Sequence, residues 1–220
     1  MPHCPLRQKT EDNMKLSGGA KISIFVVLLL VIDQVIKFAV KLNMTLGESI
    51  PVFGDWFQIC FVENNGMAFG MQFGGMVGKI LLTLFRVILI GFIIYYINKV
   101  LLKKSDTPTG VIVGVSLVLV GAIGNVIDCL FYGQIFSASS YLMVAELFPS
   151  GGGYAPLLMG KVVDMFYFPI IDTVLPEWVP IWGGEEFVFF RPVFNFADSC
   201  ISVAVIYMLL FQRKFFAKEF

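Results

Sequence analysis

Residues 22–40 read ISIFVVLLLVIDQVIKFAV. The stretch is long and apolar enough to belong to a membrane-spanning helix, but Asp33 and Lys37 interrupt it. These two residues are four apart, so one helical turn places their side chains on the same face. No small-residue cleavage site follows the stretch, so we interpret it as a first spanning helix and not as a removable signal peptide.

The composition of the whole chain also indicates a membrane protein. The 220 residues are 57% hydrophobic and 15% charged, with a mean hydropathy of +0.82, which lies outside the range of soluble domains. The formal net charge is zero and no basic face is interleaved with aromatic residues, so we expect no nucleic acid partner. The single histidine, His3, excludes a His-dependent triad and a His-rich metal site, and the four cysteines are too widely spaced for a zinc site. We therefore expect no metal and no cofactor.

Three further apolar segments predict spanning helices at about 78–97, 110–130 and 195–211. The last is marginal against the roughly 20 residues that a ~30 Å hydrocarbon core requires. In the second segment we expect Arg86 to snorkel to the interface or to pair with a nearby acid. The predicted fold is an all-α membrane protein with four transmembrane helices, a small extracytoplasmic β/loop subdomain, and one domain over residues 1–220.

The basic residues predict the orientation of these helices, because cytoplasmic flanks retain Lys and Arg. They concentrate in the arm 1–21, in the connection after the second helix and in the C-terminal tail, as Arg7, Lys9, Lys15, Lys21, Lys99, Lys103, Lys104, Arg213, Lys214 and Lys218. We therefore expect both termini in the cytoplasm and the connections 41–77 and 131–194 on the outer side. Asp33, Lys37, Asp128 and Asp198 then converge at one depth near the outer face. A charge in the hydrocarbon core costs roughly 2.5 to 3.5 kcal/mol, so this convergence is a functional-site hypothesis.

The outer connections carry their own patterns. The residues from Pro51 to Val62 predict a short strand or hairpin before a turn at 64–66. The residues 150–153 predict a flexible tip, and the aromatic residues from Trp178 to Phe190 suit the lipid headgroup region.

Two carboxylates stand in patterns that have more than one explanation. Asn195 opens the fourth helix and can cap it, with Asp198 in the first turn where the helix dipole favours an anion; a plain N-terminal cap is the commoner explanation of that pattern alone. Asp164 is flanked by apolar residues, and it either serves a turn or faces Asp198. Two carboxyl groups brought close share a proton, so one can activate water while the other protonates the substrate.

Other polar residues favour a supporting role. Gly121, Asn125 and Asp128 share one helical face, and we expect them to brace the bundle. We favour an internal ion pair for Asp33 and Lys37 over direct catalysis.

Five motifs in order resemble those of the lipoprotein signal peptidase family, also called signal peptidase II. They are Asp33 with Lys37, Asn64-Asn65-Gly66-Met67-Ala68-Phe69, Gly121-Ala122-Ile123-Gly124-Asn125-Val126-Ile127-Asp128, Val162-Val163-Asp164, and Phe194 to Ile201. The resemblance implies an aspartic endopeptidase with a catalytic dyad of Asp164 and Asp198. It implies that the remaining motif residues bind substrate or brace the site: Asp33, Lys37, Asn64, Gly66, Asn125, Asp128 and Asn195.

The resemblance also implies the setting of the reaction. The family cleaves signal peptides before a diacylglyceryl-modified cysteine, acts in the bacterial inner membrane and is the target of globomycin. The implied partners are lipid-modified prolipoprotein signal peptides and membrane lipids, and we expect a monomer. The chain departs from the family pattern at Cys129, where the motif has Arg, at Met67, where it has Ala, and in the long segment 136–159. That segment is either a lid that controls substrate access or a passive insertion.

Two other classes of function remain to be compared. A transporter or proton channel also places ions in the membrane, but it would distribute them through the full depth. A non-catalytic binding or assembly protein of the same fold would have no need of both Asp164 and Asp198. Cleavage of a lipid-modified precursor separates the peptidase from both rivals.

Overall fold

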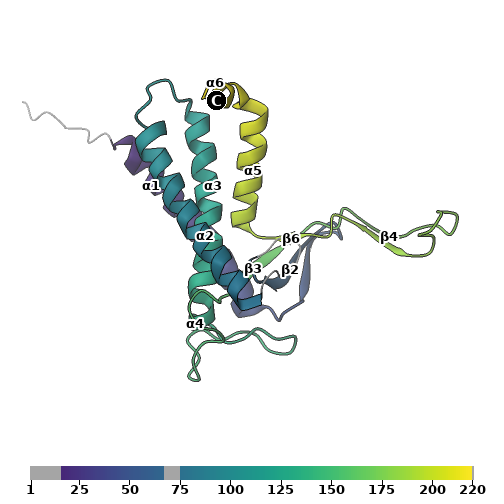
Figure 1. The fold of residues 1–220 in the computed structure, drawn as a ribbon. Coiled ribbons are helices and arrows are strands. Elements are labelled where there is room, and N and C mark those ends of the chain that lie inside the picture. Colours follow the sequence, from purple (N-terminus) through teal and green to yellow (C-terminus); the bar gives the residue numbers. More distant parts are fainter. Residues whose placement is uncertain (1–15, 67–74, 220) are drawn as a thin grey trace, which may run out of the picture.

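A bundle of helices forms the body of the molecule (Figure 1). The structure is a computed structural model, and it describes residues 16–66 and 75–219. The helices are α1 (Gly18–Asn43), α2 (Gly75–Tyr96) with its π-helical continuation η2 (Ile97–Leu101), α3 (Thr109–Ile127) continued by η3 (Asp128–Tyr132) and α4 (Gly133–Ile135), α5 (Phe196–Phe211) and α6 (Arg213–Glu219).

Among the residues that the structure describes, three helical stretches are long and apolar enough to cross a membrane: Gly18–Asn43, Gly75–Leu101 and Thr109–Ile135. The fourth predicted span corresponds to α5, which is apolar but only 16 residues long. The structure therefore describes a mostly helical, multi-pass membrane protein. It places residues 18–21 and Lys41 inside α1, whereas we predicted that they lie in the arm and in a connection.

The outward faces of the helices are apolar. On α2, Leu81, Phe85, Ile88 and Phe92 follow the helical repeat, and each is more than half exposed. An apolar face of this size is unfavourable in water, and hydrocarbon is the solvent that suits it. The opposite faces pack into an apolar core between the helices, made of Val26, Ile93, Ile97, Leu101, Val111, Leu119, Val120 and Cys200.

Glycines on α3 allow close packing against α1 and α5. A Cβ atom on Gly124 would lie 2.7 Å from a carboxylate oxygen of Asp33 and 3.0 Å from the Cβ atom of Ala197. A side chain at this position would push apart the three helices that carry the polar residues, so the close approach of α1, α3 and α5 depends on a glycine at position 124.

A four-stranded antiparallel sheet lies at one end of the bundle, which we call the sheet end (Figure 1). Its strands are β1 (Ser49–Phe53), β2 (Phe57–Asn64), β3 (Val162–Tyr167) and β6 (Val193–Phe194), in the order β1-β2-β3-β6. The hairpin of β1 and β2 confirms the strand prediction for the first outer connection. In the register of β2 with β3, Val62 lies opposite Asp164 and Asn64 lies opposite Val162, which brings the two motifs together.

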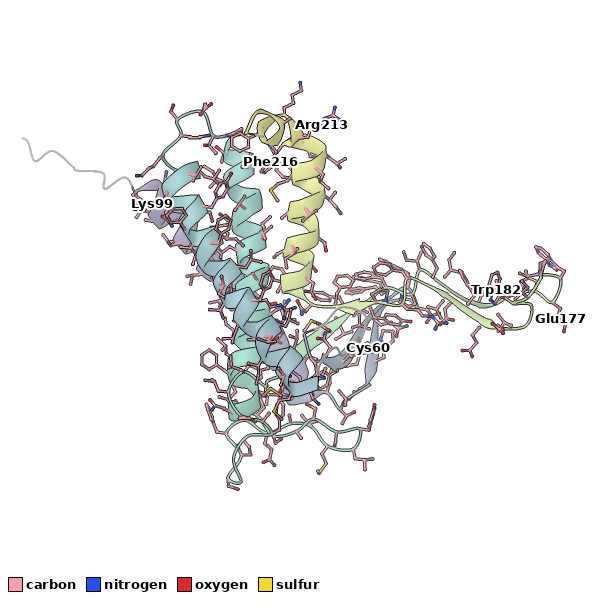
Figure 2. The ribbon with its side chains drawn as sticks, in the orientation of Figure 1. Cys60, Lys99, Glu177, Trp182, Arg213 and Phe216 are labelled. Carbon is pink, nitrogen blue, oxygen red and sulfur yellow. The ribbon has the colours of Figure 1, made fainter. Side chains whose placement is uncertain are left out.

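The long third connection makes two excursions from this sheet. Segment 136–159 folds back against the rest of the molecule through backbone hydrogen bonds such as Ala155 N to Gly133 O of α4 (2.9 Å) and Leu46 N to Ser140 O (2.9 Å). The second excursion is a hairpin arm of β4 (Ile171–Val174) and β5 (Glu186–Phe189), which projects sideways from the sheet (Figure 1). Figure 2 shows Glu177 and Trp182 near the far end of this arm.

Candidate functional site

Helix α5 begins at the sheet end with a double cap. The side chain of Asn195 accepts a hydrogen bond from the backbone N–H of Asp198 (2.9 Å), and the carboxylate of Asp198 accepts one from the backbone N–H of Asn195 (3.4 Å). Such reciprocal bonds satisfy amide groups that a helix start leaves free. The predicted cap is therefore present, and it also fixes the direction of the Asp198 side chain.

The side-chain amides of Asn195 and Asn125 connect Asp164 to Asp198. Asn195 Nδ2 donates to Asp164 Oδ1 (2.7 Å) and to Asn125 Oδ1 (3.0 Å), while Asn125 Nδ2 donates to Asp198 Oδ1 (2.8 Å). Asn64 donates to the other oxygen of Asp164. The two carboxylates of the proposed dyad thus share one network of amide donors. Within residues 16–66 and 75–219, neither carboxylate forms a salt bridge.

The electrostatics of this pair favour retention of a proton. Asp164 is 2% exposed on β3. Burial, and then the charge of Asp198, raise the pKa of Asp164 to about 7, against the hydrogen bonds from Asn195 and Asn64 that lower it. Near neutral pH the pair can therefore hold one proton between two carboxyl groups, which is the state required for concerted acid and base chemistry.

A separate ionic cluster of Asp33, Lys37 and Asp128 lies beside this pair, and we call it the bracing cluster. Lys37 Nζ lies 3.0 Å from Asp33 and 2.8 Å from Asp128, and all three side chains are fully buried. Asp33 accepts a hydrogen bond from the backbone N–H of Ala197 in the first turn of α5 (3.0 Å). Lys37 also donates to Asn125 (3.2 Å), so the bracing cluster is hydrogen-bonded to the amide network of the dyad.

Gly66 fixes the position of Asn64. Its backbone N–H donates to the side-chain oxygen of Asn64, which leaves the amide nitrogen of Asn64 directed at Asp164. Gly66 has φ +82°, a conformation that favours glycine. All nine site residues predicted from the motifs therefore lie in one connected region, whereas Met67, Ala68 and Phe69 of the second motif lie outside the described residues.

Several polar residues of this region had no role in the sequence analysis. Gln34 donates to Asp33 (3.0 Å) and to Asp128 (3.1 Å) and accepts from Tyr132 (3.0 Å). Lys41 pairs with Glu63, and Lys161 lies 3.3 Å from the same carboxylate. Residues 33, 37 and 41 are spaced by one helical turn, and this spacing indicates that Lys41 shares a face with Asp33 and Lys37. No pattern in the sequence indicates its partner Glu63.

Two cations on α2 also reach this region. Arg86 donates to the backbone carbonyl of Gly66, and Lys79 donates to Asn65 (3.1 Å) and to the carbonyl of Met159 (2.9 Å). Of the two expectations for Arg86, pairing with an acid is not met within the described part of the chain, where its partner is a carbonyl group and one of its terminal nitrogens is buried. Snorkelling to the interface stays a prediction. Among the described residues, no group of three or more His, Cys, Asp or Glu is placed to hold a metal.

Comparison with known proteins gives a consistent result. The Peptidase_A8 family model, described as signal peptidase (SPase) II, matches residues 25–214. The chain is 54% identical to a lipoprotein signal peptidase of Porphyromonas gingivalis over 196 residues, which cover 89% of this chain and 84% of that protein. It is 39% identical to a lipoprotein signal peptidase of Amoebophilus asiaticus over 188 residues, or 84% of this chain and 75% of the other.

A solved structure has a similar fold. A bacterial membrane enzyme aligns with a TM-score of 0.57 at 22% identity, and the alignment covers 91% of this chain and 92% of that one. At this level of identity the likeness concerns the fold alone.

Proposed function

The chain belongs to the signal peptidase II family and removes signal peptides from prolipoproteins, and we propose that it does so as an aspartic endopeptidase with Asp164 and Asp198 as its catalytic pair. The observation that carries this proposal is the shared amide network: two carboxylates, one of them buried with a raised pKa, meet at Asn195. Neither carboxylate pairs with a cation among the described residues.

The proposed mechanism uses the pair in its singly protonated form. Asp198, which accepts a hydrogen bond from Asn125, is the ionised member and takes a proton from a water molecule as the oxygen attacks the scissile carbonyl carbon. Asp164 is the protonated member and donates its proton to the carbonyl oxygen. As the tetrahedral intermediate collapses, the proton that Asp198 took from water passes to the leaving nitrogen and the C–N bond breaks. The carbonyl re-forms and returns its proton to Asp164, so the pair ends as it began.

The remaining site residues hold this pair in place. Asn195 and Asn64 each donate to one oxygen of Asp164, so the carboxyl group cannot rotate without losing a bond. The bracing cluster holds the start of α5 against α1 through the bond between Asp33 and Ala197. We assign positioning to these residues, because Asn195 and Asn64 fix the carboxyl group of Asp164 and the bracing cluster fixes the start of α5.

The test is turnover of a diacylglyceryl-modified precursor by purified protein. Asp164→Asn and Asp198→Asn should each lower turnover by about 10³-fold or more, since an amide cannot exchange the proton that the mechanism requires. Membrane insertion and thermal stability should stay near those of the parent protein, because an amide fills the same volume. Globomycin inhibition of the parent protein is the control for authentic cleavage. Substantial turnover by either Asn variant would refute the aspartic mechanism.

We further propose four spanning helices with both termini in the cytoplasm of a bacterial cell, and a site near the outer face of the inner membrane. In support, Lys99 and Arg213 lie at the end of the bundle away from the sheet (Figure 2), and basic flanks stay inside. An alkaline phosphatase fusion after Ser150 should be active and one after Lys104 inactive. The reverse pattern would contradict this orientation.

A further inference from the structure

Helix α2 contributes no residue to the dyad, yet two of its cations hold the turn that precedes the undescribed residues 67–74. Arg86 donates to the carbonyl of Gly66, and Lys79 donates to the side chain of Asn65. The two cations are seven residues apart, so they lie on the same face of the helix. We call residues 64–66 the asparagine turn.

The guanidinium of Arg86 is held in an unfavourable environment. Its Nη1 atom is buried and has no hydrogen-bond partner among residues 16–66 and 75–219. No carboxylate in that part of the chain forms a salt bridge with Arg86. A buried donor without a partner is destabilising, and more so when the group is charged. Within the described residues, the bond to the carbonyl of Gly66 is the specific hydrogen bond that the Arg86 guanidinium makes.

That bond leads directly to the dyad. The backbone of Gly66 donates to the Asn64 side chain, and Asn64 donates to Asp164. A shift of Gly66 would turn the Asn64 amide away from the carboxyl group. Misplacement of a catalytic group by about 1 Å can cost about 10²-fold in rate.

We propose that Arg86 is a positioning residue for catalysis, which acts by clamping the Gly66 carbonyl so that Asn64 stays bonded to Asp164. This inference rests on the proposed aspartic dyad. In this proposal, α2 holds the asparagine turn in place through its side chains. Lys79 bonds to the side chain of Asn65, and within the described part of the chain no hydrogen bond joins that side chain to Asp164 or Asp198, so Lys79 serves as the matched control.

The position of Cys129 makes a reciprocal test possible. A Cβ atom on Gly66 would lie 2.8 Å from Nη1 of Arg86 and 3.5 Å from the thiol sulfur of Cys129, so both side chains reach the same point beside the turn. In the family motif that our sequence resembles, the residue after the aspartate is Arg. An arginine at position 129 can therefore occupy the space that Arg86 leaves and bind the same carbonyl.

The experiment compares kcat, KM and the pH dependence of kcat for Arg86→Met, Arg86→Lys, Lys79→Met and the double variant Arg86→Met with Cys129→Arg. Arg86→Met should lower kcat by about 10- to 100-fold with KM within twofold. Because the bond from Asn64 lowers the pKa of Asp164, its loss should move the pH profile of kcat to higher pH. The double variant should recover both kcat and the pH profile of the parent protein. Lys79→Met should change kcat by less than threefold and should leave the pH profile in place.

Arg86→Lys keeps the charge and remains measurable if Arg86→Met does not accumulate. A lysine lacks the fork of Arg and is shorter, so the variant should show a smaller loss of kcat and the same direction of pH shift. A folded Arg86 variant with an unchanged pH profile would overturn the proposal, as would a folded double variant whose profile stays shifted. Asp164→Asn in the same assay separates the two ideas: if it remains active the dyad is wrong, and if it is inactive while Arg86→Met resembles the parent protein, only the clamp is wrong.

Discussion

The molecule holds two neighbouring groups of acidic residues, and they are compensated in different ways. In the bracing cluster, Lys37 lies within 3.0 Å of both Asp33 and Asp128. In the proposed dyad, Asp164 and Asp198 are bonded to amide groups instead of to a cation among the described residues. Burial alone therefore does not identify a catalytic acid here. The cluster with a cation links helices, whereas the pair without one can keep the proton that hydrolysis requires.

The largest effect should follow from removing the cation. Lys37→Met leaves Asp33 and Asp128 buried together without a cation, which should lower the free energy of unfolding by about 3–5 kcal/mol. Thermal unfolding of the detergent-purified variant measures this. Adding Asp128→Asn to Lys37→Met should restore part of the loss. A Lys37→Met variant as stable as the parent protein would show that the two buried carboxylates of the bracing cluster do not depend on the cation.

The next effect concerns the dyad and pH. Because the pKa of Asp164 is raised to about 7 in the folded state, the folded protein binds more protons than the unfolded chain between about pH 4 and pH 7. Its stability should therefore fall as the pH rises through this window, by up to about 4 kcal/mol. Asp164→Asn should remove the part of this slope between about pH 6 and pH 7 and raise the melting temperature above pH 7. A slope between about pH 6 and pH 7 that is unchanged in Asp164→Asn would place the responsible group elsewhere.

A smaller effect should separate the two groups by activity. Asp33→Asn and Asp128→Asn each weaken a bond to Lys37 but leave the network around Asp164 and Asp198 in place. We expect each to cost about 1–3 kcal/mol of stability and to keep measurable turnover. Turnover and unfolding of the same preparations provide the measurement. Complete loss of turnover in a stable Asp33→Asn protein would show that the bracing cluster takes part in the chemistry.

The smallest effect should come from segment 136–159, whose tip contacts neither group. Tyr141 and Leu142 are 75% and 91% exposed, while Phe136 at the base is buried. Replacing residues 141–144 with two glycines should raise KM several-fold and leave kcat within twofold. Tyr141→Ala is the single-residue control. A variant that folds and loses turnover on saturating substrate would contradict a role limited to access.

The sequence predicted the carboxylates and amides of the site because each lies in a recognisable local pattern. Asp33 and Lys37 share a helical face, and Asn195 with Asp198 forms a cap. Aspartate 164 was ambiguous by itself, and only the pairing of β3 with β2 shows how it meets Asn64.

The contacts that the sequence did not predict join residues from distant segments. Lys41 and Glu63 pair between a helix end and a strand, and Arg86 reaches a backbone carbonyl, which no sequence motif encodes. The hairpin of β4 and β5 was also missed, because its strands are short and separated by a Pro- and Gly-containing turn. Such contacts depend on tertiary geometry and leave no periodic signal in the chain.

The length of α5 has a consequence for the lipid around the site. Its 16 residues rise about 24 Å, which is shorter than a hydrocarbon core of about 30 Å. A span that is too short is accommodated by local thinning of the bilayer. If its basic C-terminal flank stays at the inner surface, the outer leaflet must dip toward the first turn, where Asp198 lies. Hydrophobic mismatch would then bring headgroups and water down to the scissile bond, so that the substrate helix need not leave the membrane to be hydrolysed.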